Sequence, residues 1–135
     1  MNKGILAAGV IAAVALVNGT AFAAGDAAAG AEVSKKCLAC HTLGKGEPNK
    51  VGPNLFGVYG RVAGTHEGYN YSESYKEMGQ KGLTWEEANL KGYLADPLSF
   101  VRAKSGDDKG KSKMTFRLTK DDEIANVIAF LMQNK

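Results

Sequence analysis

The residues best suited to chemistry stand together in one short segment, Cys37-Leu38-Ala39-Cys40-His41. Two thiols three residues apart at the end of a helix point to the same side, where they can add to the two vinyl groups of one porphyrin edge. The imidazole of His41 is then held beneath the iron and can bind it through Nε2. Because C-x-x-C-H is the attachment pattern of c-type haem, the segment predicts one covalently bound haem c with its iron.

Three other interpretations of these residues have less support in the sequence. A thioredoxin-type redox pair follows a strand in a βαβ unit, and the sequence shows no such pattern. A structural zinc site needs four ligands, and only Cys37, Cys40, His41 and the distant His66 are at hand. A plain disulfide would explain neither the adjacent His41 nor the shortage of apolar side chains.

The sixth ligand of the iron is less obvious. A methionine thioether suits an electron carrier, because Met/His ligation raises the reduction potential. Met78 falls in a short polar helix, and Met132 near the end of the last helix reads better as a packing residue. Met114 ends a loop that can fold over the haem face, so it is favoured over His66. An open sixth position would indicate ligand binding or catalysis instead.

The elements around these residues predict an all-α chain of four or five helices with long loops. Asp26 can cap a first helix over residues 27–40. Gly30 within that helix is a poor helix former, which indicates close packing against another element. Residues 42–68 are rich in Gly, Pro and Asn and predict a loop. A short helix is expected over residues 72–78.

Helix signals continue in the C-terminal half. Thr84 and Glu87 form a capping-box pattern before a helix that Asp96-Pro97 ends, and the same pair can start the next helix. Residues 102–113 predict a polar, lysine-rich loop, and Thr119 is expected to cap the last helix. The apolar residues of that helix recur at i, i+3, i+4 and i+7: Ile124, Val127, Ile128 and Leu131.

The first 23 residues resemble a secretory signal peptide. Lys3 precedes an uncharged run over residues 4–17, and the segment ends in Ala21-Phe22-Ala23, which fits an A-x-A cleavage site. Fourteen apolar residues would span only about 21 Å as a helix, too short for the hydrocarbon core of a membrane. We therefore expect cleavage after Ala23 and export of a domain over residues 24–135, to the periplasm in a bacterium.

Composition excludes several classes of function. The 135 residues include 17 Lys and Arg against 14 Asp and Glu, a formal charge of +3 that is too small to indicate a nucleic-acid binder. Removal of the segment with Lys3 leaves a charge of +2. Two cysteines cannot build a framework of several disulfides. About half of the remaining chain is expected to be loop, so a large bound cofactor would supply the missing core.

Taken together, these residues resemble class I cytochromes c, most closely the bacterial cytochrome c2 type. The resemblance covers essentially all of residues 24–135. It rests on the order of these segments: Cys37 to His41, Gly52-Pro53-Asn54-Leu55, Gly60-Arg61, Trp85, Tyr93-Leu94-Ala95-Asp96-Pro97 and Lys113-Met114-Thr115-Phe116. It implies four to five helices wrapped around one covalently attached haem, with Gly30 allowing the first helix to cross the last one closely, near Phe130.

The resemblance also implies roles for single residues. His41 would be the proximal ligand of the iron and Met114 the distal one. The Pro53 carbonyl would accept the His41 Nδ1–H, as second-shell groups of ligating imidazoles do. Tyr71 and Trp85 would hydrogen-bond a haem propionate, and Arg61 would help to balance its charge. Tyr93 would lie near the Met114 sulfur. Residues 102–113 and 72–81 are longer than in the mitochondrial pattern.

The implied function is one-electron transfer by a monomer that makes and breaks no bond. The implied partners are a cytochrome bc1 complex and a photosynthetic reaction centre or terminal oxidase, docked transiently without membrane insertion. Lysines near the attachment segment and the Met114 loop would steer docking to acidic partners: Lys35, Lys36, Lys45, Lys50, Lys104, Lys109, Lys111 and Lys113. Acidic residues would lie away from that edge: Glu86, Glu87, Asp121, Asp122 and Glu123. The alternative is a haem enzyme of peroxidase type, or a sensor domain that binds a ligand.

Overall fold

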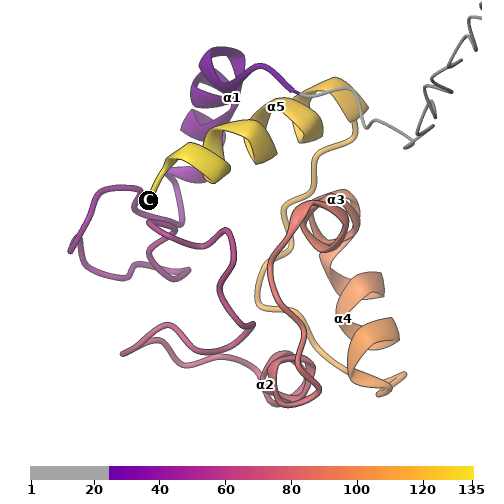
Figure 1. The fold of residues 1–135 in the computed structure, drawn as a ribbon. Coiled ribbons are helices and arrows are strands. Elements are labelled where there is room, and N and C mark those ends of the chain that lie inside the picture. Colours follow the sequence, from indigo (N-terminus) through magenta and orange to yellow (C-terminus); the bar gives the residue numbers. More distant parts are fainter. Residues whose placement is uncertain (1–24) are drawn as a thin grey trace, which may run out of the picture.

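The computed structural model describes residues 25–135, which form five α-helices and one 3-10 turn (Figure 1). The elements are α1 Ala27–Ser34, η1 Lys35–Cys37, α2 Glu73–Gln80, α3 Glu87–Ala95, α4 Pro97–Ser105 and α5 Asp121–Gln133. Within residues 25–135 there is no β-strand, and β-type pairing is limited to an isolated antiparallel bridge between Val62 and Thr84. The all-α prediction is therefore confirmed. The expected leader, residues 1–23, lies outside the described residues.

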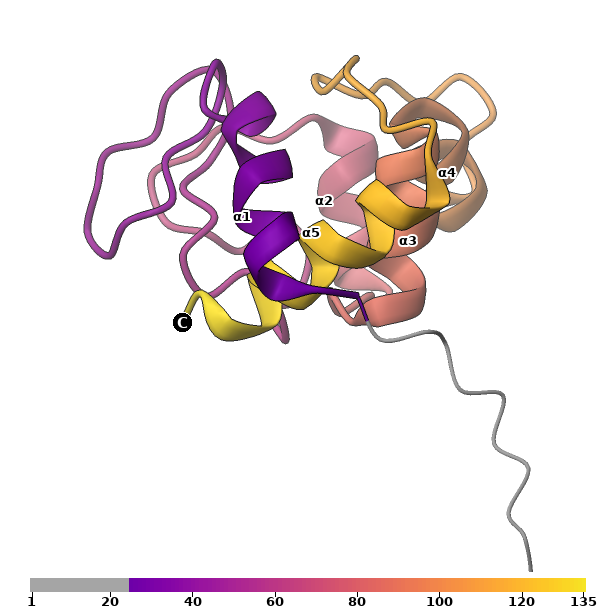
Figure 2. The same ribbon diagram turned by 90° about the horizontal axis from the view of Figure 1, so that it is seen from above.

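The first and last helices cross at close range, as Figures 1 and 2 show. Gly30 of α1 lies at the crossing, where an added Cβ would stand 1.9 Å from the Asn126 carbonyl oxygen and 2.9 Å from Phe130 Cβ. Only a residue without a side chain lets the two backbones approach this closely. The prediction that Gly30 packs against the last helix near Phe130 is confirmed.

Two of the predicted helix caps are confirmed. The Asp26 carboxylate accepts hydrogen bonds from the backbone amides of Ala28 and Ala29 at the start of α1. Asp96 accepts from the Ser99 amide at 3.1 Å, and Pro97 occupies the first turn of α4. In both cases an acidic side chain satisfies amides that the helix itself leaves without a partner.

The other two predicted caps are wrong. Glu86, rather than Thr84, caps α3, and its carboxylate accepts from the Asn89 amide at 3.2 Å. Thr84 is instead engaged in the bridge to Val62, which keeps it one turn away from the helix. The N-cap position of α5 is Lys120, with no side-chain cap, so Thr119 does not act as one.

Three helix ends also differ from expectation. The first helix gives way to the 3-10 turn at Lys35 and ends before Cys40. Helix α4 continues through Ser105, inside the predicted loop 102–113, and ends where Gly106 takes a left-handed conformation with φ of 78°. Helix α2 extends two residues past the predicted Met78, and Ser72 is its cap.

The core is formed by buried apolar side chains of α2, α3, α4 and α5 and of the segments between them. They include Met78, Trp85, Leu90, Leu94, Val101, Ile124, Val127, Ile128 and Leu131. Long irregular segments over residues 38–72 and 106–120 enclose the remaining side of the molecule (Figure 1). Among residues 25–135, no helix is both long enough and apolar enough to cross a membrane.

Candidate functional site

A cavity of about 270 Å³ lies between the irregular segments and the helical core. Its walls are mainly apolar. They bring together Cys37, Cys40 and His41 with Met114, which is more than seventy residues further along the chain. The expected gap in the core is therefore present, with sulfur and nitrogen donors around it. This donor set and these apolar walls fit a haem c.

The attachment segment forms a tight turn directly after η1. The amides of Cys40 and His41 both donate to the Cys37 carbonyl oxygen, at 3.1 and 2.9 Å. The two cysteines form no disulfide with each other, and both are partly buried. Burial, and next the Cys40 thiol, raise the pKa of Cys37, while Lys36 acts in the opposite direction.

His41 is fixed by its neighbours on one ring nitrogen. Nδ1 lies 2.7 Å from the Pro53 carbonyl oxygen, which can only accept, so Nδ1 carries the proton and Nε2 keeps its lone pair. Burial chiefly lowers the pKa of His41, and Lys50 adds to this, whereas the bond to Pro53 raises it. The arrangement gives a neutral imidazole with one nitrogen open to a metal.

Gly52 makes the His41 position possible, and sequence reasoning did not single out that role. An added Cβ on Gly52 would stand 2.4 Å from His41 Cε1 and 2.7 Å from Nδ1. The Gly52 amide also donates to the Cys40 carbonyl at 2.7 Å, which ties this loop to the attachment turn. The Gly-Pro pair in the sequence was a signal, but the clash becomes visible only in the fold.

The four candidates for the sixth ligand of the iron differ clearly in where the structure places them. Met114 lines the cavity. Met78 is fully buried in the core on α2, and Met132 is 41% exposed on α5. His66 is not among the lining residues, and its amide donates to the Tyr71 hydroxyl. Among residues 25–135, Met114 is thus the one methionine that shares the cavity with His41.

Polar and aromatic residues named from the sequence also reach the cavity: Pro53, Arg61, Tyr71, Trp85 and Tyr93. The Arg61 guanidinium donates to the carbonyl oxygens of Asn54 and Phe56, at 3.2 and 2.6 Å. Burial lowers the Arg61 pKa. Burial has the opposite effect on the phenol of Tyr93: it raises the pKa, so the phenol stays protonated. These side chains therefore offer hydrogen-bond donors to an acidic group at the cavity.

Tyr75 is a further cavity residue that the sequence analysis passed over. Its ring stacks on Tyr71 at 4.8 Å between centroids and lies 5.9 Å from that of Trp85. Trp85 in turn lies 4.9 Å from Tyr93. The spacing of Tyr71 and Tyr75 on either side of the start of α2 was the available signal. These rings form a continuous aromatic wall.

The predicted docking lysines lie in several places. Lys36 and Lys113 line the cavity, and Lys50 donates to the Leu38 carbonyl in the attachment segment at 2.5 Å. Lys35 pairs with Glu32, and Lys104 lies over the Phe100 ring at 5.7 Å. Lys45, Lys109 and Lys111 are not cavity residues. Three of the predicted set thus border the attachment segment or the cavity.

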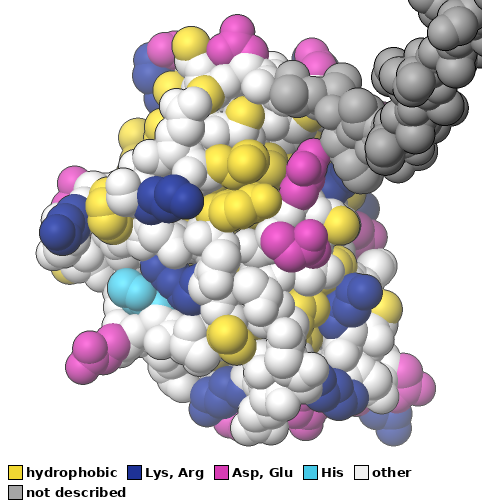
Figure 3. Space-filling model, viewed as in Figure 1, with side chains coloured by type: hydrophobic (Ala, Val, Ile, Leu, Met, Phe, Trp, Pro, Cys, Tyr) yellow, Lys and Arg dark blue, Asp and Glu magenta, His cyan; other side chains and the backbone are white. Residues whose placement is uncertain are grey.

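One acidic residue pairs with a predicted docking lysine. Glu123 forms an ion pair of 2.9 Å with Lys36. The pair is long-range in sequence and joins η1 to the first turn of α5. On the face seen in Figure 3, basic and acidic side chains alternate around the edges.

Comparison with known proteins gives a consistent picture. The family model for cytochrome c matches residues 27–135. Cytochrome c2 of Rhodospirillum rubrum is 67% identical over 131 residues, 97% of each chain. Cytochrome c2 of Cereibacter sphaeroides is 43% identical over 117 residues, 81% of this chain and 94% of the relative.

Solved structures agree with these relatives. The structure of cytochrome c2 from Rhodospirillum centenum matches with a TM-score of 0.76 and 44% identity, over 81% of this chain and 98% of that one. Together with the cavity and the C-x-x-C-H turn, these matches show that the chain belongs to the cytochrome c family, as an electron-transfer protein rather than an enzyme, with one covalently bound haem c.

Proposed function

We propose that this protein is a periplasmic one-electron carrier whose haem iron is held by His41 and Met114. The observation that carries the proposal is the cavity that Met114 shares with Cys37, Cys40 and His41. When bound, the haem supplies one-electron chemistry by cycling between Fe(II) and Fe(III). Residues 1–23 would serve as the leader that directs export and is then removed.

The proximal side is prepared by the chain itself. Cys37 and Cys40 would form the two thioethers, and the bond from His41 Nδ1–H to Pro53 keeps Nε2 unprotonated on a ring that lines the cavity. A ring held in one orientation has little to rearrange when the charge on the metal changes. The proximal geometry therefore supports fast electron transfer.

Met114 and the polar residues of the cavity would set the reduction potential of the iron and stabilise the charge of the haem propionates. A Met114 thioether favours Fe(II) relative to a second imidazole, which raises the reduction potential. Arg61, Tyr71 and Trp85 would stabilise the haem propionates, because burying a carboxylate without partners is costly. All four side chains line the cavity.

The proposed partners are a cytochrome bc1 complex as donor and a photosynthetic reaction centre or terminal oxidase as acceptor. Support comes from relatives named cytochrome c2 and from lysines at the attachment segment and cavity, Lys36, Lys50 and Lys113. Positive charge there would attract an acidic docking surface. The other predicted lysines would contribute less to this docking: Lys35, Lys45, Lys104, Lys109 and Lys111.

A Met114→Ala substitution tests the ligand set. The oxidised wild-type protein is expected to show the weak near-infrared band of a methionine sulfur bound to Fe(III), and Met114→Ala should lack it and have a lower reduction potential. Near-infrared absorption and a redox titration measure the two effects. Met132→Ala, which truncates an exposed methionine, is the control. A band that persists in Met114→Ala would contradict the assignment.

A further inference from the structure

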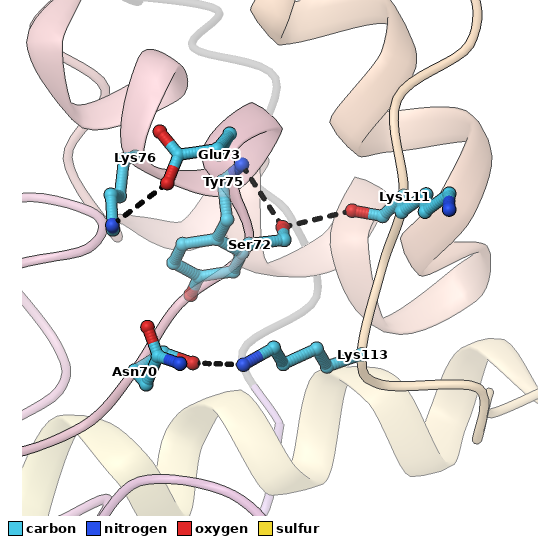
Figure 4. A network of polar contacts seen from close by, with 7 residues as sticks. All are labelled: Asn70, Ser72, Glu73, Tyr75, Lys76, Lys111 and Lys113. Carbon is cyan, nitrogen blue, oxygen red and sulfur yellow. Dashed lines mark hydrogen bonds and ion pairs between the residues drawn. The ribbon is translucent and has the colours of Figure 1, made fainter.

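Two segments far apart in the sequence meet in the structure: residues 70–74, which include the start of α2, and residues 107–113, which follow α4. Figure 4 shows Asn70 and Ser72 of the first segment beside Lys113 and Lys111 of the second. The second of these leads directly to Met114. Their contacts are polar, which distinguishes them from the apolar packing of the core.

Alternate residues of the first segment bind the second. Asn70 accepts from the Lys113 ammonium through its carbonyl, and the Ser72 hydroxyl donates to the Lys111 carbonyl at 2.9 Å. The Ser74 hydroxyl accepts from the Lys111 amide at 3.4 Å. The backbone of Lys111, three residues before Met114, is therefore held on both its donor and its acceptor. We call Asn70, Ser72 and Ser74 the α2 clamp.

The clamp is closely fitted around Ser74. This side chain is 6% exposed, and its hydroxyl donates to the Asp107 carboxylate at 3.4 Å. An added Cβ on Gly110 would stand 2.8 Å from Ser74 Oγ. The loop thus approaches the helix as closely as a residue without a side chain allows.

The α2 clamp is held in place by the N-cap of α2 and by aromatic stacking at the start of this helix. Ser72 also caps α2, accepting from the Tyr75 amide at 3.3 Å, and the Tyr75 ring stacks on Tyr71 in the aromatic wall. Beyond Lys111, the Lys113 ammonium bonds the Asn70 carbonyl, and the Ser112 hydroxyl donates to the Met114 carbonyl at 2.8 Å within the loop itself. Within residues 25–135, the loop backbone next bonds to another backbone group at Leu118, whose amide donates to the Leu94 carbonyl. Met114 therefore lies on a span whose backbone is held to other elements at Lys111 and at Leu118, with the Lys113 side chain as a further tie to Asn70.

We propose that Ser72 and Ser74 are positioning residues for Met114, and that the α2 clamp sets how often the Met114 sulfur leaves the cavity. The inference rests on the proposed ligand role of Met114. Opening of the span requires the hydrogen bonds to Lys111 to break, and each contributes to the closed state. The clamp thereby protects the distal position from foreign ligands.

The test uses ferric holoprotein mixed rapidly with imidazole, a nitrogen ligand that can bind only when Met114 leaves. Loss of the near-infrared methionine band reports the opening rate at saturating imidazole. Ser74→Ala removes the hydroxyl and favours the helix, so a faster rate cannot come from a weakened α2. Ser72→Gly removes the other hydroxyl while it keeps most of the N-cap stability. Ser72→Gly is expected to open roughly fivefold faster, the effect of the lost hydrogen bond to Lys111, and Ser74→Ala at least as much faster, because it also loses the bond to Asp107.

Two further variants complete the test. Ser72→Thr keeps the hydroxyl and should open at the wild-type rate, and Ser99→Ala removes a hydroxyl bonded within α4, to Asp96, and should do the same. Unchanged rates in Ser74→Ala and Ser72→Gly, with the band intact, would overturn the clamp alone. A wild-type protein without the band would overturn the ligand proposal and the clamp together.

Discussion

At the scale of single residues, the proximal side of the site depends on the absence of a side chain at Gly52 as much as on the imidazole of His41. The ring of His41 occupies the space of a Gly52 side chain, while the carbonyl of Pro53, the next residue, accepts a hydrogen bond from its Nδ1–H. Two consecutive residues therefore fix both the place and the orientation of the imidazole.

Gly52→Ala tests this directly. The methyl group would stand 2.4 Å from His41 Cε1, so the ring must move away from Pro53. We expect a loss of about 1–3 kcal/mol in the free energy of unfolding, the usual cost of overpacking. The Nδ1 proton should also exchange faster with water, which NMR measures. Gly44→Ala is the matched control, because its methyl meets only the flexible end of the Glu47 side chain. Equal effects in the two variants would contradict the argument.

At the scale of elements, local signals were predictable and tertiary ones were not. Asp26 and Asp96 were recognised as caps because a cap binds amides only two or three residues away. Thr84 carried an equally good local pattern, but its pairing with Val62, more than twenty residues earlier, moved the start of α3 to Glu87. The sequence contains no local sign of that bridge.

Prediction of the site shows the same division. Cys37, Cys40 and His41 are adjacent in sequence, so their spacing alone indicated haem attachment. Met114 could be favoured only by eliminating other residues and by family resemblance, since its approach to the cavity depends on how residues 106–120 fold back. Tyr75 was missed because the packing of α2 on Trp85 places it in the cavity wall.

Gly30→Ala separates helix propensity from packing. In an exposed helix this change stabilises by about 1 kcal/mol. Here the new methyl would stand 1.9 Å from the Asn126 carbonyl oxygen of α5, and a backbone atom cannot move aside cheaply. We expect a loss of about 1–3 kcal/mol in the free energy of unfolding, measured by denaturant titration of the holoprotein. Ala28→Gly on the exposed side of α1 calibrates the propensity. A stabilised Gly30→Ala protein would show that the helices can separate freely.

At the scale of the whole molecule, the position of charge matters more than its sum. The chain carries a formal charge of only +3, and the Lys36–Glu123 ion pair mixes signs near the cavity. Screening limits the reach of a surface charge to about 10 Å at 0.1 M salt. Lysines beside the docking site should therefore affect association far more than equally charged residues elsewhere.

Charge-matched lysine variants test that argument. Lys36→Gln and Lys50→Gln remove charge at the cavity and at the attachment segment, whereas Lys120→Gln removes the same charge from the N-cap of α5, outside the cavity lining. We expect the first two to slow the bimolecular electron transfer with an acidic partner several-fold at low ionic strength, and the difference from wild type to vanish at high salt. Stopped-flow kinetics with a purified reaction centre, across a salt series, measure both effects. If Lys120→Gln slowed the reaction as much as Lys50→Gln, net charge rather than a docking site would govern association, and the proposed docking surface would be wrong.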